Sequence, residues 1–154
     1  HREYLCMEDK DPREKFAETL IEALGDKGTI FTYTGYEEGV LRGVARSFPH
    51  FETKILALTD RFKDLYAIIR HHYYHPHFHG SFSLKYVLPA LVPSMDYKNL
   101  SIQEGTLASL EYLRMIDVGT SAPEKARIKK DLLEYCGIDT LGMVMIRDEL
   151  LKRT

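Results

Sequence analysis

At residues 25–33 the sequence reads Gly25-Asp26-Lys27-Gly28-Thr29-Ile30-Phe31-Thr32-Tyr33. The first four residues are turn formers, and the last five are rich in β-branched and aromatic side chains, as expected of a buried strand. Helical patterns flank this stretch over residues 12–24 and 35–48. A strand between two helices predicts an α/β domain.

Outward from this strand, the chain is mostly helical. Residues 3–7 predict a short second strand, Asp11 is placed to cap the helix over 12–24, and residues 71–81 read as a loop. Further helices are predicted over 53–70 with an interruption near Thr59-Asp60 or Asp64, over 84–91 after Ser83, over 101–116, and over 123–152 with a break or bend around Gly137. One or two strands make a poor sheet for an α/β domain standing alone, so we expect a helix-rich domain whose opening strands are missing. The start at His1 without Met fits a fragment of a longer protein.

Composition limits the classes of protein that remain. With 154 residues and 44% hydrophobic residues, the chain is long enough for one compact domain, so we expect residues 1–154 to belong to one. A formal net charge of -2 excludes a broad basic face that grips nucleic acid by charge alone. No uninterrupted apolar run approaches the ~20 residues of a membrane span. Cys6 and Cys136 are expected to be reduced thiols in a cytoplasmic protein.

Glu37 occupies an unusual position in the predicted helix over 35–48. At 100° per residue, several apolar side chains fall within roughly 80° of it, whereas Glu38 lies on the flank. These apolar residues are Val40, Leu41, Val44, Ala45 and Phe48. A carboxylate is rarely buried without a partner, because burying its charge costs several kcal/mol. Glu37 therefore needs an explanation.

Asp139 stands in the same kind of position on the last predicted helix. Its apolar neighbours within roughly 60° include Ile128, Leu132 and Ile146, provided that the helix continues through Gly137. Tyr135 lies four residues earlier, so a helix places its phenol and the Asp139 carboxylate on one face. A tyrosine hydroxyl beside a metal-bound carboxylate can orient an attacking water for phosphodiester hydrolysis. Alternatively, Tyr135 is an ordinary half-buried tyrosine.

Two explanations of these acids remain open. Each carboxylate could cap a neighbouring helix or pair with a cation such as Arg42, Lys85 or Arg147. Alternatively, Glu37 and Asp139 converge at the end of a sheet and hold a divalent metal, where hard oxygen ligands suit Mg²⁺ or Mn²⁺.

The order of these features resembles that of the DEDD exonuclease superfamily in its tyrosine-bearing branch, and more closely the family catalogued as domain of unknown function 2779. The latter looks like a member of the ribonuclease-H-like group. The matching segments run in order along almost the whole chain. They are Asp11-Pro12-Arg13, Tyr33-Thr34-Gly35-Tyr36-Glu37 with Leu41, Arg61 to Leu65, Tyr73-Tyr74-His75-Pro76, Gly80-Ser81, Ser83-Leu84-Lys85, Val87-Leu88-Pro89, Gly105 with Ala108, and Tyr135-Cys136-Gly137-Ile138-Asp139-Thr140.

The resemblance implies an α/β ribonuclease-H-like fold and a 3′–5′ exonuclease with two divalent ions, Mg²⁺ or Mn²⁺. Glu37 would stand at the second acidic motif, Asp139 at the third, and Tyr135 would orient water. The family pattern commonly has Asn where Thr34 stands, and most DEDD exonucleases have Asp where Glu37 stands. The first motif, Asp-x-Glu, has no counterpart in this chain, which implies that the fragment is inactive by itself. The incomplete sheet leaves pairing with a second copy open.

Secondary candidates lie in the middle of the chain. Lys85 at the start of a short helix, with Ser83 before it and Tyr74 in the preceding loop, could bind a single strand of DNA or RNA. Tyr73, Tyr74 and Phe78 could stack on bases or form the core of their own loop, and Lys85 could equally be a solvated lysine. Asp64 is expected to be a helix cap and is a secondary site candidate. The alternating His75, His77 and His79 are either exposed loop residues or ligands of zinc or nickel.

Two functions outside hydrolysis compete with the nuclease. One is a non-catalytic module that binds nucleic acid or protein and retains the exonuclease scaffold. The other is a metal protein built on the histidine loop.

Overall fold

The computed structural model describes residues 1–153 and divides them into two compact units. The first unit comprises His1–Cys6 and Lys10–Tyr74. The second comprises Met7–Asp9 and the chain from His75 onward. Both are helix-rich, and the only strands in the described residues belong to the first unit, so the molecule is a helix-rich α/β protein.

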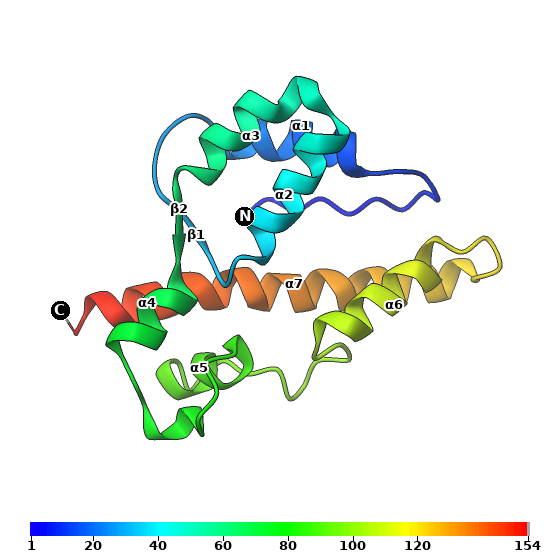
Figure 1. Ribbon diagram of the computed structural model, residues 1–154. Coiled ribbons are helices and arrows are strands. Elements are labelled where there is room, and N and C mark those ends of the chain that lie inside the picture. The colour runs from blue at the N-terminus through cyan, green and yellow to red at the C-terminus, as the bar shows by residue number, and fades with distance from the viewer. Residues whose placement is uncertain (154) are drawn as a thin grey trace. The chain divides into compact units, whose positions relative to one another are not determined.

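The first unit contains two strands that pair in parallel. Its elements are α1 (Arg13–Leu24), β1 (Ile30–Thr32), α2 (Tyr36–Ser47), η1 (Pro49–Phe51), α3 (Glu52–Thr59), β2 (Phe62–Asp64) and α4 (Leu65–His72). Ile30 pairs with Phe62 and Thr32 with Asp64. Helices α2 and α3 make the crossover between the strands, as Figure 1 shows, and parallel strands require such a connection. Both strands therefore end at the same edge of the small sheet.

Three helices supply the apolar core of this unit. Ala17 of α1, the inner face of α2 and Ile55 of α3 are buried together with Phe51. The buried residues of α2 are Leu41, Val44 and Ala45. They follow the stripe that the sequence predicted, except that Val40 is 41% exposed. The core fixes the rotation of α2 and so the direction of the residues in its first turn.

Arg61 holds the turn that leads into β1. Its guanidinium donates hydrogen bonds to four backbone carbonyls at the end of α1 and in the following loop. These acceptors are Leu24 at 3.1 Å, Gly25 at 2.5 Å, Lys27 at 2.5 Å and Gly28 at 2.7 Å. An ammonium group could not reproduce this fan of donors, because only a guanidinium presents five N–H groups in one plane.

The second unit is built around one long helix. Its elements are η2 (Pro76–Phe78), α5 (Leu84–Leu91), α6 (Gly105–Ile116) and α7 (Ala122–Leu151). Both α5 and α6 pack on α7. Gly142 of α7 is buried against Leu88 of α5, where an added Cβ would lie 2.8 Å from Leu88 Cδ2. The absence of a side chain at Gly142 therefore lets the two helices approach closely.

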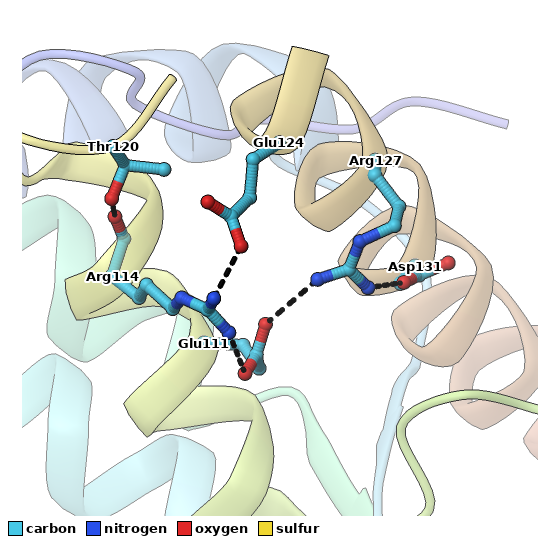
Figure 2. Close-up of polar contacts among 6 residues, drawn as sticks. All are labelled: Glu111, Arg114, Thr120, Glu124, Arg127 and Asp131. Carbon is cyan, nitrogen blue, oxygen red and sulfur yellow. Dashed lines mark hydrogen bonds and ion pairs between the residues drawn. The ribbon is translucent and has the colours of Figure 1, made fainter. Parts of the chain in front are cut away.

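Charged side chains tie α6 to α7 at the other end of the second unit (Figure 2). Arg114 of α6 contacts Glu124 of α7, and Arg127 of α7 reaches back to Glu111 of α6 at 3.8 Å. Figure 2 draws the whole network, which comprises Glu111, Arg114, Thr120, Glu124, Arg127 and Asp131. Ion pairs near the surface contribute about 0–1 kcal/mol each, so each of these contacts adds little to stability.

Several predictions about elements were wrong. No strand forms over residues 3–7, although Cys6 is buried. The helix expected over 53–70 is interrupted after Thr59, as predicted, but the interruption contains the strand β2, which was not predicted, because Phe62–Asp64 pairs with β1. Helix α7 runs unbroken through Gly137, and α6 begins at Gly105 rather than at residue 101. Residues 71–81 are not all loop, since α4 reaches His72 and η2 follows.

Other predictions were confirmed. The strand around Ile30 and the helices that correspond to α1, α2 and α5 lie close to their expected bounds. Ser83 occupies the N-cap position of α5, although its side chain makes no capping hydrogen bond. No helix within residues 1–153 combines the length and the apolar character that crossing a bilayer requires.

Candidate functional site

Glu37 lies where the parallel strands of the first unit end. It sits in the first turn of α2, four residues after Tyr33, and Tyr33 directly follows Thr32, the last paired residue of β1. The backbone N–H of Tyr33 lies 3.5 Å from Glu37 Oε1, at the limit of a hydrogen bond. The Oε2 atom is shielded from solvent. Glu37 thus points inward at the edge of the sheet where ligands of α/β proteins usually bind.

The neighbouring acid behaves as the sequence predicted. Glu38 pairs with Arg42 one turn further along α2 at 2.7 Å and is partly exposed. Arg42, one of the cations considered as a partner for Glu37, is therefore engaged by Glu38.

Asp64 has a structural role at the same edge. Its Oδ1 atom accepts a hydrogen bond from the backbone N–H of Tyr66 at 2.9 Å, which caps α4 as expected. The same oxygen accepts the backbone N–H of Thr34 at 2.8 Å. Thr34 adopts a φ of 73°, in the left-handed region that β-branched residues avoid. Asp64 thus holds a strained turn directly before Glu37.

The acid of the second unit lies between two tyrosines. The hydroxyl of Tyr97 donates to Asp139 Oδ1 at 2.6 Å, and the hydroxyl of Tyr135 also bonds to this carboxylate. The two rings are tilted against each other, with centroids 6.2 Å apart. Tyr135 and Asp139 share one face of α7, as the spacing predicted, and Tyr97 joins them from the irregular segment after α5.

Burial perturbs both titratable groups of this cluster. It raises the pKa of Asp139 above the usual range of an aspartate, although the hydrogen bonds from Tyr97 and Tyr135 act in the opposite direction. Burial and the nearby Asp139 charge raise the pKa of Tyr135 to about 12. At neutral pH the phenol of Tyr135 is therefore a hydrogen-bond donor and not a base.

Tyr97 was missed in the sequence. It is 6% exposed and belongs to the stretch between α5 and α6, where no helical or strand period marks an inward-facing residue. Tyr97 is recognised as a site residue only through its contact with Asp139, because the hydroxyl of a buried tyrosine needs a hydrogen-bond partner.

The remaining candidates are spread over both units. Lys85 and Ser83 stand at the start of α5 in the second unit, and Lys85 lines a cavity. Tyr74 closes the first unit and is 57% exposed. Phe78 is fully buried, so it belongs to the core of its loop and is not available for stacking on bases.

The donor atoms suit a hard cation, but each unit contributes few of them. Glu37 offers a carboxylate in the first unit and Asp139 offers one in the second, and both are oxygen ligands of the kind that Mg²⁺ and Mn²⁺ prefer. Among residues 1–153, no three His, Cys, Asp or Glu side chains gather as a group able to hold a metal ion.

Fold and site together define a helix-rich α/β protein with inward-facing acids, one of them where two parallel strands end. The chain belongs to the family described as domain of unknown function (DUF2779), which matches residues 1–83, more than half of its length. The match includes Glu37 and Asp64 and ends before Lys85, Tyr135 and Asp139. No curated protein and no solved structure is significantly similar to this chain.

Proposed function

We propose that the chain carries part of the catalytic site of a ribonuclease-H-like 3′–5′ exonuclease that removes nucleotides from single-stranded DNA or RNA. Glu37 and Asp139 would hold divalent metal in this site, and the Tyr135 hydroxyl would orient the attacking water. The proposed compartment is the cytoplasm, where Cys6 and Cys136 stay reduced.

One observation carries the proposal, namely the environment of Asp139. This carboxylate is half-buried, has a raised pKa and is held by two tyrosine hydroxyls. It forms no ion pair with any residue in the described part of the chain. A carboxylate that is kept in such a place favours a cation from outside the protein, because burial of an ion is otherwise costly.

The position of Glu37 supports the same function. The turn before α2 is strained at Thr34 and held by Asp64, and strained backbone persists where the surrounding structure enforces it, often at functional sites. This turn directs Glu37 to the carboxyl edge of the sheet. An Asn at position 34 would fit the left-handed backbone better than Thr does, since Asn tolerates that conformation.

In this proposal the bound metal ions would polarise the phosphoryl oxygens and activate water. The protein groups would act around them. Glu37 and Asp139 would fix the ion positions, and Tyr97 would hold the Asp139 carboxylate in one orientation through its 2.6 Å hydrogen bond. Tyr135, protonated at neutral pH, would hydrogen-bond the attacking water and would not remove its proton.

The test is a nuclease assay on the full-length protein. Oligonucleotides of single-stranded DNA and RNA labelled at the 5′ end are incubated with MnCl₂, MgCl₂ or EDTA, and products are resolved by length. We expect metal-dependent shortening from the 3′ end. Glu37→Gln and Asp139→Asn should each reduce the rate by at least about 100-fold, because each removes a proposed metal ligand. Tyr135→Phe should lower kcat more than it raises KM.

Glu38→Gln provides the matched control, since Glu38 is the next residue but pairs with Arg42 at the surface. Its rate should stay within about two-fold of the wild type. The proposal is overturned if the full-length protein hydrolyses neither nucleic acid with either metal. It is equally overturned if hydrolysis survives both Glu37→Gln and Asp139→Asn, as expected of a module that binds without catalysing or of a contaminating enzyme.

A further inference from the structure

The second unit contains an open cavity of about 600 Å³. Its lining comes from the loop around η2, from α5 and from the segment that follows α5. Lys85, Tyr86 and Tyr97 are among the lining residues, so the cavity shares a wall with the Asp139 cluster. Its size is within the range of small-molecule sites.

We propose that this cavity binds one nucleoside monophosphate unit of a nucleic acid strand, with the phosphate at Lys85 and the base against Tyr86. The proposal rests on the proposed function, because it names the part of the substrate that this unit would hold. Three features of the cavity carry it.

The first feature is the balance of charge. Lys85 and Lys98 contribute two cations, and Asp96 contributes one anion. Asp96 is partly engaged by Lys98, whose Nζ lies 3.8 Å from Asp96 Oδ2. Lys85 forms no ion pair within residues 1–153 and is exposed to the cavity. A free ammonium group of this kind suits a phosphate as a point charge with three donors.

The second feature is an exposed aromatic surface. Tyr86 is 43% exposed, and the ring of His79 meets its ring edge-on with centroids 6.5 Å apart. The His77 ring stacks on the His79 ring at an interplanar angle of 16°. An exposed ring in a cavity can stack on any base, and such stacking contributes about 1–3 kcal/mol per base.

The histidine loop is built to present these rings. Phe78 is fully buried and packs near Phe82, with ring centroids 5.9 Å apart, so it anchors the loop. The flanking His77 and His79 then face outward on either side of the anchor, and both line the cavity. Two of the three alternating histidines, His77 and His79, therefore flank one buried phenylalanine and line the cavity.

The third feature is the link to the acid. Tyr97 lines the cavity while its hydroxyl holds Asp139. A nucleotide unit in the cavity would therefore lie one side chain away from the carboxylate that is proposed to bind metal. This arrangement would place a phosphodiester next to the reacting groups.

The experiment measures binding without catalysis. Isothermal titration calorimetry on the full-length protein in EDTA compares AMP with adenosine and with inorganic phosphate. We expect AMP to bind at least ten-fold more tightly than either fragment, because only AMP uses both halves of the cavity. Lys85→Gln should weaken AMP binding about ten-fold and leave adenosine unchanged, since it removes the charge-assisted contact to phosphate. Tyr86→Ala should weaken both ligands about ten-fold, whereas Tyr86→Phe should weaken neither.

Lys129→Gln is the control for loss of a surface charge, because Lys129 is exposed on α7 and does not line the cavity. It should leave AMP binding unchanged. The inference is overturned if AMP does not bind at millimolar concentration, if phosphate alone binds as tightly as AMP, or if Lys85→Gln and Tyr86→Ala leave its affinity unchanged.

The two proposals fail in different ways. If AMP binding depends on Lys85 and Tyr86 but no hydrolysis occurs with Mg²⁺ or Mn²⁺, the cavity stands and the nuclease falls. If hydrolysis depends on Asp139 but AMP binding ignores both cavity residues, the nuclease stands and the nucleotide cavity falls.

Discussion

The hydrogen bond from Tyr97 to Asp139 gives a prediction whose size and sign both follow from the structure. Tyr97→Phe removes one oxygen atom and leaves the buried ring in place. At 2.6 Å the bond falls in the range of a charge-assisted O–H···O⁻ contact. Such bonds contribute about 1.5–3 kcal/mol, against about 1 kcal/mol between neutral groups. We therefore expect Tyr97→Phe to lower the free energy of unfolding by about 2 kcal/mol when Asp139 is ionised.

The stability loss caused by Tyr97→Phe should depend on pH, and the pKa shift of Asp139 gives the direction of this dependence. The folded-state pKa of Asp139 is raised above its unfolded value, so ionising this carboxylate costs stability. That cost is absent below the unfolded pKa and complete above the folded pKa. The Tyr97 hydroxyl lowers the folded pKa, so its removal enlarges the cost. The difference between wild type and variant should thus grow as pH rises through the folded pKa of Asp139.

Urea denaturation followed by far-UV circular dichroism measures this effect at pH 8 and near pH 4. A loss of about 2 kcal/mol shifts the midpoint by about 1 M urea for a slope near 2 kcal/mol/M. Tyr36→Phe is the control, because Tyr36 is 75% exposed, and it should change stability by less than about 0.5 kcal/mol. An equal loss at both pH values, or a larger loss at low pH, would refute the reasoning. So would an NMR titration in which the Asp139 pKa of the variant does not rise.

Three further predictions concern the scaffold, and each is measured as a change in the free energy of unfolding. Arg61→Ala should lower the free energy of unfolding by about 2–4 kcal/mol, because four carbonyls lose a charged donor but remain open to water. Arg61→Lys should recover less than half of this loss. Full recovery would contradict a role for the planar guanidinium. Gly142→Ala should lower the free energy of unfolding by about 1–2 kcal/mol, because its new Cβ would contact Leu88. Gly137 lies on the same helix with open space at Cβ, so Gly137→Ala should stabilise by up to about 1 kcal/mol. Changes of the same sign in both variants would contradict this packing. Thr34→Asn should stabilise by about 1 kcal/mol through relief of left-handed strain, and a loss would show that the turn depends on the threonine itself.

The sequence predicted those features of the site that depend only on neighbouring residues in the chain. The strand at Ile30 and the helix that carries Glu37 could be identified because turn formers, β-branched residues and a helical stripe follow one another without conflict. The relation of Tyr135 to Asp139 could be predicted for the same reason, since residues four apart on a helix share a face.

Features that depend on distant partners could not be predicted in this way. The three residues of β2 are a strand only because β1 lies beside them, and their own sequence lies within a helical pattern. Residues 3–7 form no strand, although their sequence resembles one. Gly137 does not interrupt α7, because one glycine costs a long helix only about 1 kcal/mol. Tyr97 reaches Asp139 across 42 positions of sequence from a segment without periodic structure.

The four hydrogen bonds donated by Arg61 affect the order in which the first unit folds. Arg61 immediately precedes β2, so the pairing of β2 with β1 and the closure of the Gly25–Gly28 turn both require the segment that contains Arg61 and β2 to reach β1. Closing a loop of more than thirty residues loses chain entropy before any contact forms, which slows such steps relative to local helix formation. During synthesis or refolding, Glu37 should therefore acquire its native orientation late, after the helices around it have already formed.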